Sequence, residues 1–223
     1  MTQSDASRAP AASPAKPVDL EVIIDPRIEL MLIVQYLTGD YERRTNLITN
    51  FDFEYKREIE EHFRPFAEHP AVAAFWEMAR QGFSFDACPE AALHLTPDAE
   101  LQVRAPLPDD LLERAGGAAT FENFRAQLAD FAKVSGFFEF FAQHEDLYSE
   151  LTMIVRKGMR PAVLVGALNT YTGMQVRNAT LVLFPLGHPG GFAAQITTPA
   201  RDDQPAGMEV YALIGPGGAI DDR

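Results

Sequence analysis

Residues 25–39 predict a helix that is apolar on almost every side. Asp25 stands where an N-cap is expected, Pro26 follows at the first helical position, and Gly39 marks the end. Between these residues the apolar side chains do not keep to one stripe, which is typical of a helix surrounded by other elements. We therefore expect this helix at the centre of the fold.

Two charged residues, Arg27 and Glu29, interrupt this apolar helix. Burying a charge is costly unless the charge is paired and hydrogen-bonded. The two residues are therefore candidates either for a buried ion pair that organises the fold or for part of a polar cleft, and we favour the ion pair. Neither is assigned a catalytic, cofactor-binding or metal-binding role.

Helical patterns continue over more than half of the chain. Phe and other apolar residues recur at intervals of three and four, for example at Phe121, Phe124, Leu128 and Phe131, and a second series follows from Phe137. These series predict two packed helices, because a Phe stripe is more typical of a core than of a ligand site. The residues after Pro161 fit a further helix or a buried strand equally well.

The last part of the chain changes to strand-like runs separated by turn residues. The three runs are 179–184, 192–198 and 208–214. Residues 1–18 are an Ala/Pro/Ser tract that we expect to be disordered. The predicted fold class is α+β, with one domain over 19–223. Its mainly helical part spans 25–173, and a small antiparallel three-stranded sheet lies within 174–215.

Composition excludes several classes of protein. The 223 residues include 32 Asp and Glu against 19 Lys and Arg, a formal net charge of −13. This balance argues against nucleic acid as a partner, because sequence-independent affinity for phosphates comes from Lys and Arg. No run of 18 apolar residues occurs, so no membrane span is predicted.

The single cysteine, Cys88, cannot form an internal disulfide or a multi-thiolate zinc site, and we expect a buried structural thiol.

Tests for known catalytic motifs are negative. His144 opens a stretch that begins like the zinc-peptidase helix motif, which needs a second His four residues later, where Tyr148 stands instead. The nucleophile elbow, the P-loop and the dinucleotide-binding glycine loop have no match. The histidines considered singly for acid–base or metal chemistry are His62, His69, His94, His144 and His188. None of them forms a recognisable constellation.

A set of short motifs carries a family resemblance. The most specific is Asp-Pro-Arg-Ile-Glu-Leu at 25–30. Weaker pieces follow in order: Tyr41, Tyr55 to Phe63, His69 to Val72, Phe85 to Ala87, Phe131, Phe137 to Phe141, and Tyr148. Over about residues 20–215, this order resembles an uncharacterised bacterial family whose members look like zincin-type metallopeptidases.

The resemblance implies a helical amino-terminal part that leads through strands to a helix with a His-Glu-x-x-His motif. In zincins that motif supplies two zinc ligands and the Glu that polarises the zinc-bound water. No such motif follows the 208–214 run in this sequence, so no catalytic or metal residue is carried over. The resemblance also places 208–214 as an edge strand that can align an extended peptide.

Three interpretations stay open. The first, which we favour, is that the chain is the amino-terminal part of a longer zincin-like metallopeptidase, non-catalytic by itself and with zinc only if a further segment supplies the ligands. The second is a complete, non-enzymatic domain that binds a peptide or protein. The third is a helical domain that binds a small ligand. As written, the chain is expected to hold no cofactor and to have neither nucleic acid nor a membrane as a partner.

Overall fold

The computed structural model describes residues 20–39, 48–159, 170, 178–198 and 207–215. The tract at 1–18 and almost all of the ambiguous segment after Pro161 lie outside these residues. The helices are α1 (Pro26–Leu37), α3 (Glu54–Phe63), the 3-10 turn η1 (Arg64–Phe66), α4 (Pro70–Arg80), α5 (Ala87–Leu93), α6 (Asp109–Arg114), α7 (Ala118–Val134), α8 (Phe137–Gln143) and α9 (Glu145–Gly158). The strands are β1 (Leu20–Ile24), β2 (Asn178–Leu183), β3 (Gly190–Thr198) and β4 (Gly207–Gly215).

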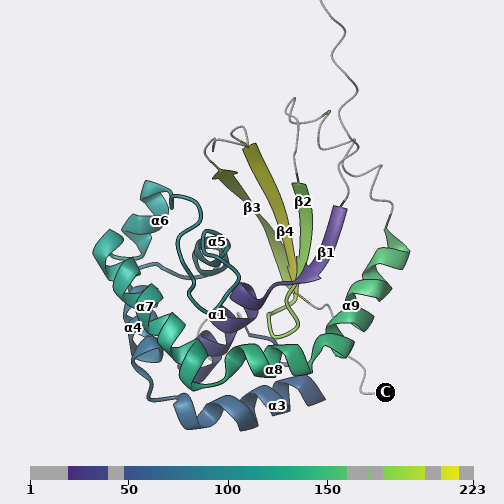
Figure 1. Cartoon of the computed structure of the whole chain (residues 1–223), viewed down its shortest axis with the longest axis horizontal. Coiled ribbons are helices and arrows are strands. Elements are labelled where there is room, and N and C mark those ends of the chain that lie inside the picture. Colours follow the sequence, from purple (N-terminus) through teal and green to yellow (C-terminus); the bar gives the residue numbers. More distant parts are fainter. Residues whose placement is uncertain (1–19, 40–47, 160–169, 171–177, 199–206, 216–223) are drawn as a thin grey trace, which may run out of the picture.

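Helix α1 begins where the sequence predicts. The Asp25 side chain accepts a hydrogen bond from the Arg27 backbone amide at 2.9 Å, and Pro26 occupies the first turn. Most of the helix is buried, and it packs against α3, α4, α5 and α8 (Figure 1). The prediction of a central helix is therefore confirmed.

The sheet differs from the prediction in the number and direction of its strands. It has four strands in the order β1-β2-β4-β3; β1 and β4 both pair in parallel with β2, and only β3 and β4 are antiparallel. The α+β class is confirmed, but the three-stranded antiparallel sheet is wrong. Parallel partners are joined by long connections rather than tight turns, so their pairing leaves no local signal in the sequence.

The edge strand on this side of the sheet is β3, not the 208–214 run that was expected there. The 208–214 run lies inside β4, between β2 and β3, so it is an internal strand. The edge next to it is β3, and no described strand pairs with the outer side of β3. Along β3, Ala194 and Ile196 are buried whereas Gln195 and Thr197 are exposed, so one face packs on the core.

The helices lie around the sheet as Figure 1 shows. Helix α9 runs beside β1, whereas α5 and, lower in this view, α1 lie on the opposite side of the sheet, near β3. The first Phe series forms α7, as predicted, but the second divides into α8 and α9 at His144. The His144 imidazole is 2.8 Å from the Phe140 carbonyl oxygen and so occupies the C-terminus of α8. None of the helices in the described ranges is long and apolar enough to span a bilayer.

Candidate ligand-binding site

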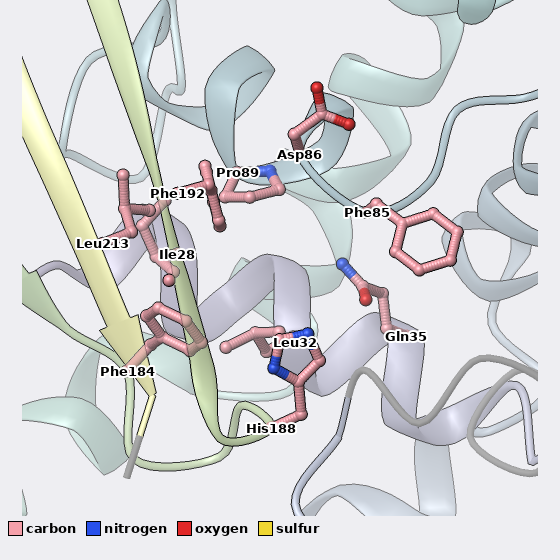
Figure 2. A pocket seen from close by; sticks show the side chains of 11 residues that line it. Ile28, Leu32, Gln35, Phe85, Asp86, Pro89, Phe184, His188, Phe192 and Leu213 are labelled. Carbon is pink, nitrogen blue, oxygen red and sulfur yellow. The ribbon is translucent and has the colours of Figure 1, made fainter. Parts of the chain in front are cut away.

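An apolar cavity of about 190 Å³ lies between α1 and the end of the sheet formed by β3 and β4 (Figure 2). Most of its walls are hydrophobic side chains from three parts of the chain: the buried side of α1, the sheet, and the start of α5. The residues that line it are Ile28, Leu32, Gln35, Phe85, Asp86, Pro89, Phe184, His188, Gly191, Phe192 and Leu213. An apolar cavity with a few polar groups is the usual form of a small-ligand or side-chain site.

Two polar side chains in this cavity lack partners for buried atoms. Gln35, on α1, is only 1% exposed, and its Oε1 atom has no hydrogen-bond partner. His188, in the loop between β2 and β3, has a buried Nδ1 atom that also lacks a partner. An unpaired buried polar atom costs about 1–3 kcal/mol, and native proteins have few of them. Because two of them belong to residues that line one cavity, we take this cavity as the candidate ligand site.

An exposed phenylalanine stands at the rim. Phe85 is 55% exposed and has a φ of +56°, a conformation that bulky residues seldom adopt. The Arg114 guanidinium holds this loop by donating to the Gly82 and Ser84 carbonyl oxygens, at 3.0 and 2.7 Å, and to the Asp86 carboxylate at 2.9 Å. The hydrogen bonds from Arg114 lower the pKa of Asp86. The rim is thus held in place by α6.

Arg27, the first of the two sequence candidates, pairs with Asp25 rather than with Glu29. Its Nε and Nη2 atoms donate to the two Asp25 carboxylate oxygens at 2.9 and 2.5 Å. Its Nη1 atom donates to the Leu93 and Leu95 carbonyl oxygens at 3.2 and 2.8 Å. The Arg27 side chain is 7% exposed and the Asp25 side chain 2% exposed. This buried ion pair therefore joins the start of α1 to the end of α5 in the interior of the protein.

Arg27 also borders a second, polar hollow of about 300 Å³ beside β2 and β4. There the Arg104 guanidinium donates to both carboxylate oxygens of Glu209, at 3.2 and 2.7 Å, and to the Tyr211 hydroxyl at 3.2 Å. The Tyr211 hydroxyl donates in turn to Glu209 at 2.8 Å. Because these charges already neutralise one another, the hollow offers little attraction to a charged ligand.

Glu29, the second sequence candidate, is fully buried on the other side of α1. The Tyr55 hydroxyl donates to Glu29 Oε2 at 2.8 Å and lies 2.7 Å from the Tyr148 hydroxyl. Burial raises the pKa of Glu29 to about 8, although the Tyr55 hydroxyl and the nearby Leu186 amide act in the opposite direction. Burial likewise raises the pKa values of Tyr55 and Tyr148. Burial therefore favours the protonated form of Glu29 in the folded protein.

The other histidines make structural contacts. His62 contacts the Ser135 carbonyl oxygen at 2.8 Å, and His94 contacts the Ala105 carbonyl oxygen at 3.2 Å. His69 caps α4, accepting from the Ala71 amide at 3.2 Å. His144 pairs with Glu58 at 2.7 Å. Within the part of the chain that the structure describes, no three His, Cys, Asp or Glu side chains come together as metal ligands.

Cys88 is a buried thiol, as the sequence predicts. It is 0% exposed and its Sγ atom donates to the Phe83 carbonyl oxygen at 3.3 Å. Burial raises the pKa of this thiol, so the reactive thiolate form is disfavoured.

The fold and the cavity define an α+β domain built on a mixed sheet with a ligand-sized hollow under its edge strand. A family model described as "Domain of unknown function (DUF4932)" matches residues 20–216, so the chain belongs to this family. The expectation of an uncharacterised family is thereby confirmed, and the family's description names no activity. Searches of curated proteins and of solved structures gave no significant match.

The cavity was not predicted from the sequence. Gln35 carried a weak signal, because it is an amide in an otherwise apolar helix. His188 was considered only as one of five single histidines, and the glycine-rich loop around it is typical of a turn. What makes them a site is that α1 and the loop after β2 meet at the edge of the sheet, and this proximity depends on the tertiary fold.

Proposed function

We propose that this domain binds an extended peptide along the outer edge of β3, as the amino-terminal part of a zincin-like metallopeptidase. The observation that carries the proposal is the position of β3. It is an edge strand, antiparallel to its neighbour, and its residues Gly191 and Phe192 line the apolar cavity. A peptide added to this edge would therefore lie next to a hollow that can receive one of its side chains.

Strand addition uses backbone groups that an edge leaves unpaired. Every second residue of an edge strand turns its amide and carbonyl outward, so a peptide gains affinity from main-chain hydrogen bonds and selectivity from pockets for its side chains. The resemblance implies peptide alignment on the 208–214 run, but that run is internal, so the proposal places the peptide on β3, the edge strand next to it.

Zinc chemistry does not enter this proposal. A catalytic zinc site needs three protein ligands and an open position, and the residues described here bring no such set together. In this proposal the described part of the domain positions a peptide.

The test is calorimetric titration with the capped peptide Ac-Thr-Val-Tyr-Val-Lys-NH2 and two N-methylated isomers. One isomer carries methyl groups on the two Val amides, and the other on the Thr and Tyr amides. In an added strand only alternate amides face β3. We therefore expect one isomer to bind about tenfold more weakly, from the loss of two hydrogen bonds worth about 0.5–1.5 kcal/mol each, and the other to bind nearly as the parent does.

The two isomers control for each other, since they have the same composition, charge and number of methyl groups. Equal affinity of both isomers and the parent peptide would contradict strand addition. So would the absence of any binding by the parent.

A further inference from the structure

We infer that the cavity beneath β3 is a specificity pocket for a tyrosine side chain, an aromatic ring that ends in a hydroxyl. This inference rests on the proposed function, because it names the peptide side chain that the β3 edge would present. It stands on three observations: the apolar walls, the exposed aromatic rim, and the two polar groups without partners.

The walls fit an aromatic ring. Ile28 and Leu32 lie on one side, from α1, and Phe184, Phe192 and Leu213 lie on the sheet side (Figure 2). Aromatic rings bury a large apolar area and favour edge-to-face or offset contacts with other rings. Phe184 and Phe192 already form such a pair, with ring centroids 6.3 Å apart and tilted planes.

The rim offers a further ring. Phe85 borders the cavity yet is more than half exposed, so its hydrophobic surface is unused in the described structure. Its backbone conformation is unfavourable and is maintained by the Arg114 hydrogen bonds. A strained, exposed aromatic residue at the mouth of an apolar cavity is suited to contact a bound ring.

The polar groups specify what the ring must carry. Gln35 and His188 both line the cavity, and each has a buried atom without a hydrogen-bond partner. A side-chain amide and an imidazole can each donate or accept. A phenolic hydroxyl can donate to Gln35 Oε1 and accept from His188 Nδ1 in its N–H form, whereas an indole can only donate and a phenyl ring can do neither. The pair therefore favours tyrosine over tryptophan and phenylalanine.

The experiment compares N-acetyl-tyrosinamide with N-acetyl-phenylalaninamide, which differ by one hydroxyl and are too short to form a strand. Binding to the full chain is followed by NMR chemical-shift titration. We expect the tyrosine derivative to bind at least tenfold more tightly, because a site built for a hydroxyl is left with unpaired groups by the analogue that lacks it. N-acetyl-tryptophanamide is expected to bind more weakly than the tyrosine derivative.

The protein variants are Gln35→Leu and, as a matched control, Gln127→Leu. Gln127 on α7 also has a buried Oε1 atom without a partner, but it does not line the cavity. We expect Gln35→Leu to abolish the preference for the tyrosine derivative, and Gln127→Leu to keep it. Gln35→Leu removes an unpaired buried amide, so its thermal unfolding temperature is expected to equal or exceed that of the wild type, which shows that the variant is folded.

Three results would overturn the inference. They are equal affinity of the wild-type chain for the tyrosine and phenylalanine derivatives, no binding of either at tens of millimolar, and an unchanged preference in Gln35→Leu. Failure of the proposed function gives a different result: the tyrosine preference persists, while the two N-methylated peptides bind equally. If one peptide isomer is weakened but the tyrosine preference is absent, strand addition stands and the pocket assignment falls.

Discussion

Arg27→Ala is expected to lower the free energy of unfolding by about 3–5 kcal/mol, the cost of leaving one member of a buried ion pair without its partner. The Asp25 carboxylate would lose its ion-pair partner at 2% exposure, and the Leu95 carbonyl oxygen would lose its donor, whereas the Leu93 carbonyl oxygen would keep the hydrogen bond from Arg104 Nε at 2.8 Å. The measurement is urea denaturation followed by circular dichroism. A loss of this size is a large part of the stability of an ordinary domain.

Two further variants keep this prediction testable if Arg27→Ala fails to fold. The double variant Arg27→Met, Asp25→Asn removes both charges, so it is expected to lose less stability than Arg27→Ala. Arg80→Ala breaks an exposed pair with Glu77, and its effect is expected to be under about 1 kcal/mol. If Arg27→Ala keeps its stability and instead loses peptide binding, Arg27 belongs to a polar cleft.

Glu29→Gln is expected to stabilise the protein increasingly as the pH rises from about 5 to 8. The pKa of Glu29 is raised from 4.5 to about 8 in the folded state, so between these values the folded protein holds a proton that the unfolded chain releases. Stability therefore falls as the pH rises through this window, by up to about 1.4 kcal/mol per pH unit. Gln cannot ionise, yet its amide oxygen can still accept from Tyr55.

The measurement for Glu29→Gln is the free energy of unfolding of wild type and variant at several pH values, because their difference cancels the other titrating groups. Glu77→Gln, the same substitution at an exposed position on α4, is the control for the change in net charge. Parallel curves for wild type and Glu29→Gln would show that Glu29 does not hold its proton in the folded state.

Local interactions were the part of the fold that the sequence could predict. The cap at Asp25 depends on the next few residues, and the runs that became β2, β3 and β4 are each bounded by turn residues. β1 was missed because its five residues lie directly before a helix and pair with β2, which follows all the described helices in the sequence. Strand direction was wrong for the same reason, since two of the three pairings are parallel.

The contacts of the candidate site residues were harder to predict from the sequence than the secondary structure was. Charge patterning drew attention to Arg27 and Glu29, but their partners could not be read from it. The partner of Arg27 is two residues away in the cap, whereas Glu29 accepts a hydrogen bond from Tyr55 on α3, and the Tyr55 hydroxyl in turn lies beside the Tyr148 hydroxyl on α9. The family resemblance predicted that the 208–214 run is the edge strand that binds a peptide. This prediction is wrong, because β4, which contains this run, lies between β2 and β3.

The pairing of β1 with β2 has a consequence for how the chain folds. β1 is synthesised before all the described helices, whereas its hydrogen-bonding partner β2 is synthesised after them. Contacts between residues so distant in sequence carry a high cost in loop-closure entropy and slow the folding of a domain. We therefore expect the backbone of β1 to stay unpaired during synthesis while the helices pack around α1. Completion of the sheet is then the last and slowest folding step. The intermediate that precedes it has unpaired strand backbone and is the species most prone to aggregation.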